Sequence, residues 1–257
     1  MLTIIACMKF VHTELLSSNQ QKAGAYTLNP YDLYMLTQLM EIKKKIPCRI
    51  IGITMGPQSC MSAAQKYIPF GLDDIYLVSA PIFSGSDTYA TAYILSQAIK
   101  HIGQADIYAF GEKSIDGETS QVPIGVASLL ELPCYVGVES IHDYHETAQQ
   151  LNRIWMNHTE TLVPICPYVV SFRGFITKEP IISLLKLKQC KDHLPVVLNA
   201  ESFIIDKNRC GQKGSKSKVI QTTNIVNARK AIRIEGNSQD KIRFLSELLI
   251  QNGDDFS

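Results

Sequence analysis

Residues 106–130 read DIYAFGEKSIDGETSQVPIGVASLL, and this stretch contains the parts of one α/β unit. Asp106–Phe110 is a short, largely apolar run, which predicts a buried strand. A polar loop follows at 111–118, and Thr119–Leu130 then has the apolar spacing of a helix. A buried strand that leads through a polar loop into a helix is the unit from which parallel α/β sheets are built.

The same alternation fills the first half of the chain. Three further apolar runs predict buried strands at Leu2–Met8, Arg49–Met55 and Asp74–Val78. Three segments with helical spacing lie between them, at Pro30–Lys45, Gln58–Tyr67 and Thr88–Ile102. Because parallel strands need crossover connections, this order predicts an α/β, Rossmann-like, mostly parallel sheet with helices on both faces.

The pattern changes beyond the fourth helix. Cys134–Ile141 and Pro167–Phe172 are bulky, β-favouring runs that predict strands. Between them, Gln150–Met156 and Thr159–Ile165 predict a hairpin that turns at Asn157-His158. We therefore expect antiparallel additions to the sheet in this region.

Regular patterns become sparse near the C-terminus. Residues 1–192 are predicted to form the α/β domain, and 193–257 an extended C-terminal arm. A short helix is expected at Ile181–Lys188. The arm is expected to end in an amphipathic helix at Ser238–Gln251, with Ser238 as its N-cap.

The bulk composition excludes several classes of protein. The 257 residues are 46% hydrophobic and 19% charged, so the chain can bury a core and is not disordered. A net charge of +1 gives no sign of nucleic-acid binding. With no signal peptide, no stretch long enough to enter a membrane and seven cysteines without C-x-x-C spacing, we expect a cytoplasmic protein without a metal site.

Candidate chemistry lies where the predicted strands end, because open parallel sheets bind ligands beyond the carboxyl ends of their strands. The first strand ends at Cys7-Met8-Lys9 and the second at Met55-Gly56-Pro57. The fourth ends in the loop Gly111–Gln121, which has a turn at Asp116-Gly117 and a helix N-terminus suited to a phosphate. A polar loop that caps a helix is also ordinary, so this loop alone leaves nucleotide binding open.

Other catalytic patterns are weak or absent. The chain contains no G-x-G-x-x-G, no Walker A and no G-x-S-x-G sequence. His142 and His145 lie close together, but their polar flanks favour a surface hairpin over a metal site. Trp155, between two apolar residues of a predicted strand, favours a core position over a flavin-stacking one.

The order of several short motifs resembles the electron transfer flavoprotein β subunit, the family also called FixA. The resemblance covers nearly the whole chain and is specific through the order and spacing of its motifs. They are Met8-Lys9, Asn29-Pro30-Tyr31-Asp32, Thr54-Met55-Gly56-Pro57, Ile68–Asp73, Asp87-Thr88-Tyr89-Ala90-Thr91 and Gly111–Val122, where Glu118 replaces an aspartate of the family pattern.

The later part of the chain resembles the family less closely. Pro180–Lys191 matches the family's partner-recognition segment, with Ile181 and Leu185 in place of its arginine and second proline. Gly214–Val219 is similar to an element of the longer, bifurcating-type branch. The resemblance implies that a dehydrogenase or other redox partner docks through Leu184.

The resemblance also implies a fold, a cofactor and a partner. The fold is similar to the adenine nucleotide α-hydrolases, and the chain is an electron carrier rather than an enzyme. It pairs with an α subunit that bears FAD and on which the arm packs, and it holds FAD or AMP in its own crevice. The implied cofactor-binding residues are Cys7, Lys9, Asn29, Pro30, Tyr31, Asp32, Met55, Gly56, Asp87, Thr88, Thr91, Gly111, Ser114, Ile115, Asp116, Gly117, Glu118, Thr119, Ser120, Gln121 and Val122.

Two alternatives of another class remain. An adenine-nucleotide hydrolase or synthetase would need a loop of the S-G-G-x-D-S type after the first strand, where this chain has Lys9–Thr13. A stress-type sensor that binds AMP or ATP as a homodimer would share the fold without an α subunit.

Overall fold

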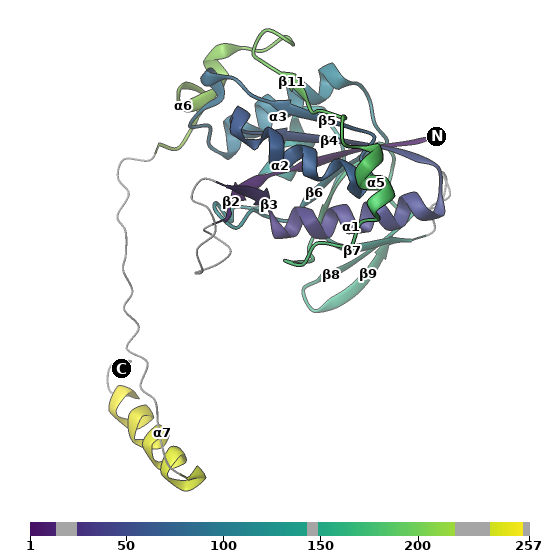
Figure 1. Cartoon of the computed structure of the whole chain (residues 1–257). Coiled ribbons are helices and arrows are strands. Elements are labelled where there is room, and N and C mark those ends of the chain that lie inside the picture. Colours follow the sequence, from purple (N-terminus) through teal and green to yellow (C-terminus); the bar gives the residue numbers. More distant parts are fainter. Residues whose placement is uncertain (14–24, 143–148, 219–236, 254–257) are drawn as a thin grey trace. The chain divides into compact units, whose positions relative to one another are not determined.

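One large sheet organises the first part of the chain (Figure 1). The computed structural model describes residues 1–13, 25–142, 149–218 and 237–253. The chain divides into two units, Met1–Lys218 and Val219–Ser257, and each is described by itself. Within the described residues of the first unit, the nine-stranded sheet has the order β11 (Val196–Leu198), β5 (Asp74–Val78), β4 (Cys48–Met55), β1 (Leu2–Met8), β6 (Ile107–Gly111), β10 (Tyr168–Phe172), β7 (Cys134–His142), β8 (Gln150–Trp155) and β9 (His158–Leu162).

The strands from β11 to β7 in this order run parallel. Along β1 the buried side chains alternate between two core clusters, Ile4 and Met8 on one face and Ile5 and Cys7 on the other. A strand buried on both faces must be apolar at nearly every position, which explains the continuous apolar runs in the sequence. The predicted parallel α/β sheet is confirmed.

Two helices cover each face of the sheet. On one side, α1 (Pro30–Lys45) and α2 (Met61–Lys66) pack through Leu36, Leu39 and Ala64. On the other, α3 (Thr88–Ile102) and α4 (Val122–Leu130) pack through residues such as Ile94 and Val126. The shorter elements are β2 (Phe10–His12) and β3 (Tyr26–Leu28), which pair antiparallel, α5 (Leu184–Gln189), α6 (Gly211–Gly214) and the 3₁₀ helices η2 (Gln58–Cys60), η3 (Ile68–Phe70), η4 (Pro81–Phe83) and η5 (Lys207–Arg209).

The expected antiparallel addition is the hairpin β8–β9, which continues the sheet beyond β7. Its turn lies one residue earlier than predicted, at Met156-Asn157, where both residues have positive φ values. Expecting Pro167–Phe172 among the antiparallel strands was wrong, because β10 inserts between β6 and β7 and runs parallel to both.

Three predicted helices begin later than the sequence suggested, including the short helix expected at Ile181–Lys188, which spans Leu184–Gln189. The segment 58–67 is divided into η2 and α2. The helix predicted from Thr119 begins at Val122, because Glu118 and Ser120 have φ values of 48° and 54°, which no right-handed helix accommodates.

The first unit extends beyond the domain boundary predicted at residue 192. β11 adds to the sheet edge beside β5, and the chain stays within this unit to Lys218. In the second unit α7 spans Ser238–Gly253. Asn237 rather than Ser238 caps it, since the Asn237 side chain accepts hydrogen bonds from the N–H groups of Gln239 and Asp240. Among the described residues, no helix has the length and apolar character required to span a bilayer.

Candidate functional site

The candidate site lies at the carboxyl ends of β1 and β6, the point where the direction of the chain across the sheet reverses. From β1 the chain continues to β4 and β5 on one side, whereas β6 begins the other side. Such a reversal leaves adjacent strand ends whose following loops separate to opposite faces, and open α/β sheets bind ligands there. The structure places the ends of β1 and β6 side by side, so the loops after residues 8 and 111 begin next to each other, where the crevice is expected.

Asp32 joins the two strand ends. Its Oδ2 accepts a 2.8 Å hydrogen bond from the Lys9 N–H, and its Oδ1 accepts a 3.0 Å bond from the Gly111 N–H. Asp32 is only 5% exposed, and burial raises its pKa to about 7, although hydrogen bonds including those from Lys9, Asn29 and Gly111 oppose this rise. The buried Asp32 carboxylate thus links the ends of β1 and β6 through hydrogen bonds.

Asn29 fixes the loop that follows β6. It bonds to the Asp32 side chain, but it makes no capping hydrogen bond to the backbone of α1, which it precedes. Instead its Nδ2 donates to the Lys113 carbonyl at 2.8 Å, and its Oδ1 accepts from the Ile115 N–H at 3.2 Å. Because both polar atoms of the amide are used, Asn29 shapes the site through the loop 113–115.

Lys9 brings a positive charge to the same loop. Its Nζ lies 2.6 Å from Asp116 Oδ2 and 2.7 Å from Oδ1. Burial raises the pKa of Asp116, but hydrogen bonds from Lys9 and Ser114 and the charge of Lys9 outweigh it and lower the pKa below its ordinary value. The Lys9 side chain is still 46% exposed, so it remains accessible to an anion.

The loop itself supplies backbone donors. It turns at 115–117, where the Glu118 N–H bonds to the Ser114 carbonyl at 2.9 Å. Beyond the turn, no acceptor among the described residues pairs with the N–H groups of Thr119, Ser120 or Gln121. Successive N–H groups in a segment with alternating backbone handedness form an anion-binding concavity, so this donor set fits a phosphate.

Gly111 allows the helix to approach the strand end. A Cβ at this position would collide with the Asp32 carboxylate and lie 2.7 Å from the backbone carbon of Tyr31. Only glycine permits such close contact between β6 and the start of α1.

Cys7 and Met55 lie at the carboxyl ends of β1 and β4. Cys7 is 5% exposed and belongs to the core cluster against which Met55 packs. Burial raises the pKa of the Cys7 thiol well above its usual range, and the charge of Asp32 acts in the same direction. The thiol is therefore protonated and behaves as a buried apolar group, not as a nucleophile.

The expected site residues Asp87 and Thr88 are neighbours in the chain but contact different parts of the protein. Thr88 Oγ1 donates to Gln121 Oε1 at 2.9 Å, which joins α3 to the loop. Asp87 instead accepts bonds from Ala90, Lys216 and Ser217. For Thr91 the structure shows only the helical bond from its N–H to the Asp87 carbonyl.

The remaining expected residues surround this centre. Pro30 is buried at the start of α1, and the Tyr31 ring meets Phe175 at 5.1 Å between centroids. The Gly56 N–H donates to the Val78 carbonyl at 3.2 Å, which fixes the turn after β4. Gly117 is exposed at the turn of the loop, and Val122 is half-buried as the first residue of α4.

One residue of the site and one long-range partner were not among the residues predicted from the sequence. Lys113 lies 5.7 Å from the Tyr31 ring centroid and 3.6 Å from the Glu118 carboxylate, and its place inside the polar loop was a usable signal. Ser217 bonds to Asp87 across 130 residues of sequence, for which no local signal exists. Within the described residues, no cluster of His, Cys, Asp and Glu could hold a metal ion; His145 of the considered pair lies outside them.

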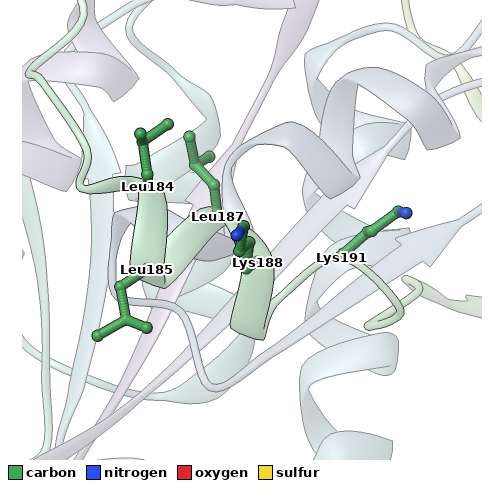
Figure 2. Close-up of a pocket in the computed structure, with 5 residues that line it drawn as sticks. All are labelled: Leu184, Leu185, Leu187, Lys188 and Lys191. Atoms are coloured by element: carbon green, nitrogen blue, oxygen red, sulfur yellow. The ribbon is translucent and has the colours of Figure 1, made fainter.

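A second candidate surface is the helix α5 and the loop after it. Leu184 and Leu185 are 78% and 66% exposed, which is unusual for leucine side chains. Figure 2 shows Leu185 extending away from Leu184 and Leu187. A hollow of about 400 Å³ lies on this helix. Its lining consists of Leu184, Leu185, Leu187, Lys188 and Lys191, so it is apolar with basic groups.

Comparison with known proteins gives consistent matches. The sequence model of the family described as the electron transfer flavoprotein domain matches residues 20–182. The chain is 30% identical to an electron transfer flavoprotein subunit beta of Thermoanaerobacterium thermosaccharolyticum, over 86% of this chain and 85% of that protein.

Two other relatives cover most of the chain. A FixA protein of Sinorhizobium fredii is 30% identical over 84% of this chain and 81% of its own. An acryloyl-CoA reductase electron transfer subunit gamma of Anaerotignum propionicum is 27% identical over 88% of this chain and 87% of its own. From the domain match and these similarities, the chain belongs to the electron transfer flavoprotein family, among the proteins similar to its β subunits and FixA.

Proposed function

We propose that this chain is the β-type subunit of an electron transfer flavoprotein, and that its crevice holds an adenine nucleotide, FAD or AMP. The observation that carries the proposal is the arrangement at the ends of β1 and β6. Asn29 and Asp32, from one motif at the start of α1, organise the strand ends and the loop 113–115. The names of the relatives support a carrier role within an electron transfer complex.

Different residues of the crevice are suited to different parts of the nucleotide. The N–H groups of Thr119, Ser120 and Gln121, with the Lys9 ammonium, are the donors suited to its phosphates. Cys7 and Met55 form an apolar floor suited to a flat ring. When FAD is bound, its flavin supplies the redox chemistry, and the protein supplies position and electrostatic environment.

A nucleotide with a flavin would extend beyond the phosphates, and we propose that it approaches the start of α3. Thr88 and Thr91 lie there, and Thr88 already contacts the loop through Gln121. The similarity of Gly214–Val219 to the bifurcating-type branch supports FAD as the occupant.

We further propose that the chain forms a heterodimer with a FAD-bearing α subunit and that α5 docks a redox partner. Leu184 and Leu185 have too much exposed surface to serve the fold, and Lys188 and Lys191 favour an acidic rim on the partner. Replacing Leu184 by alanine should leave the heterodimer intact and slow its electron exchange with that partner.

The test is co-expression with an electron transfer flavoprotein α subunit. The expected product is a yellow heterodimer, and release of the bound nucleotides by denaturation gives their identity and number. Two FAD molecules per heterodimer would assign FAD to the crevice, and one FAD with one AMP would assign AMP. A colourless, nucleotide-free heterodimer, or a stable homodimer that ignores the α subunit, contradicts the proposal.

A further inference from the structure

The last part of the first unit forms a strap, here defined as Asp206–Lys218, that lies against α3 and the loop before it. At its start the Asp206 N–H donates to the Tyr93 hydroxyl at 2.9 Å, and the Arg209 guanidinium lies 3.9 Å from the centroid of the same ring. Further along, the Gly211 N–H donates to Ser86 Oγ at 3.1 Å. The strap is therefore attached to residues more than a hundred positions earlier in the chain.

Close packing holds the middle of the strap. Gly211 has a φ of +58°, and a Cβ there would collide with the Ile82 carbonyl and lie 2.9 Å from the Ser84 carbonyl oxygen. A residue with a side chain would both strain the backbone and separate the two segments. The strap is thus fitted to the loop 82–87.

Asp87 anchors the end of the strap. Its Oδ2 accepts bonds from the N–H of Lys216 at 2.7 Å and from the N–H and hydroxyl of Ser217 at 2.8 and 3.1 Å. Its own N–H donates to Ser215 Oγ at 2.9 Å. Burial raises the pKa of Asp87, but these bonds and that from Ala90 outweigh it and lower the pKa below the ordinary value.

The next residue connects the anchor to the loop of the crevice. Thr88 Oγ1 donates to Gln121 Oε1 at 2.9 Å. Gln121 is the N-cap residue of α4 and follows the free donors Thr119 and Ser120. One dipeptide, Asp87-Thr88, therefore contacts the strap with its first residue and the crevice loop with its second.

We propose that Asp87 and Thr88 are positioning residues that couple the strap to the nucleotide loop, so that a bound nucleotide and an anchored strap stabilise each other. The proposal rests on the nucleotide binding proposed above. A nucleotide that orders the loop fixes Gln121, and Gln121 holds Thr88 at the start of α3. Because Asp87 precedes Thr88 in the backbone, its carboxylate is then held where the strap requires it.

Coupling between two sites is reciprocal, so the effect must appear in both directions. One hydrogen bond carries the connection, and a typical net hydrogen-bond contribution corresponds to a change of about threefold to tenfold. Nucleotide should therefore slow amide exchange in the strap by about this factor, and loss of the anchor should weaken nucleotide binding by a similar factor.

The experiment measures hydrogen–deuterium exchange of strap peptides in the full chain, with and without AMP or FAD at concentrations shown by calorimetry to saturate. Thr88→Val has nearly the same shape as threonine but cannot donate to Gln121, whereas Asp87→Asn replaces one acceptor oxygen by a donor. Thr37→Val is the control for the first, because the Thr37 hydroxyl bonds only to the Tyr34 carbonyl of its own helix among the described residues. Asp192→Asn is the exposed control for the second.

In the wild type and both controls, nucleotide should slow exchange in the strap. Thr88→Val should keep the slow exchange of the free protein but lose the response to nucleotide. Asp87→Asn should exchange faster in the strap with and without nucleotide and bind nucleotide more weakly, while its thermal unfolding remains cooperative. A Ser217→Ala chain, which lacks one of the three bonds to Oδ2, should fall between the wild type and Asp87→Asn.

Two results are distinguishable failures. If AMP and FAD bind with the expected stoichiometry but the strap does not respond, or if Thr88→Val responds like the wild type, the coupling is wrong and the proposed function stands. If neither nucleotide binds to the chain or to its heterodimer, the proposed nucleotide site is wrong, and the proposed coupling is then wrong as well.

Discussion

The Gly111 N–H donates a 3.0 Å hydrogen bond to Oδ1 of Asp32, and this bond joins the end of β6 to the first turn of α1. The same carboxylate also holds the end of β1 through Lys9. One buried side chain thus ties the ends of two neighbouring strands to the start of α1, and several consequences can be measured.

Gly111→Ala should destabilise the fold, because the added Cβ would collide with the Asp32 carboxylate and the backbone of Tyr31. Overpacking of this kind costs about 1–3 kcal/mol, measurable as a lower midpoint in urea. Gly117→Ala is the matched control in the same loop, since its Cβ would meet only Ser114 Oγ at 3.7 Å. Equal losses in the two variants would show that Gly111 is not a contact point.

Asp32→Asn should also destabilise the fold, although the side chains are nearly equal in shape. The amide has one acceptor oxygen, so its NH₂ group must face one of the two N–H donors now bonded to the carboxylate. A buried donor left unsatisfied costs about 1–3 kcal/mol. Urea unfolding at one pH gives the difference in free energy of unfolding between the wild type and Asp32→Asn. An unchanged free energy would contradict the role of Asp32 in linking the two strand ends.

The stability of the wild type should depend on pH through Asp32. Its pKa is raised from 3.8 to about 7 by burial, so between these values the folded state binds a proton that the unfolded state has released. This contribution to stability is complete below the unfolded pKa and is lost as pH rises through about 7.

The difference in free energy of unfolding between wild type and Asp32→Asn isolates this contribution from other titrating groups. It should shrink as pH rises from 5 and become constant above the pKa of about 7. A difference that stays constant over this range would mean that the folded carboxylate is ionised throughout, contrary to the raised pKa.

Lys9→Met tests the proposed phosphate contact. The pair of Lys9 with Asp116 is largely exposed, so its loss should change the free energy of unfolding by less than about 1 kcal/mol. Nucleotide affinity should fall roughly tenfold, since a hydrogen bond to a charged group is lost. The remaining affinity should also depend less on salt concentration.

The control is Lys44→Met, which removes a lysine that is 62% exposed and pairs with Glu41 on the outside of α1. It should leave the affinity unchanged. Calorimetric titration with AMP or FAD measures both variants, and an equal effect of the two would mean that only the net charge matters.

Much of the fold was predictable because its signals are local. A strand buried on both faces needs apolar residues at successive positions, and this made β1, β4, β5 and β6 visible. The helix ends also carry local features, namely the lysines in the last turn of α1 and the Asp87 side chain that caps α3. The loop Gly111–Gln121 was identified because polar residues followed a buried strand.

Other features had no local signal. The left-handed backbone of Glu118 and Ser120 depends on the tertiary contacts of the loop. Because of it, α4 begins at Val122 and not at Thr119. The direction of β10 depends on a return of the chain between β6 and β7, which an apolar run of five residues does not encode. The partners of Asn29 in the loop after β6 lie more than eighty residues away.

The sequence by itself determined the class of the fold, the order of the family motifs and the loops that meet at the crevice, because burial and strand order act through patterns along the chain. Only the tertiary structure decided that the side chains of Asp32 and Asn29 form hydrogen bonds within the protein, and that Asp87 binds the strap near the end of the first unit. These roles depend on hydrogen bonds between residues 23 to 130 positions apart, and such partners exist only when the sheet has assembled.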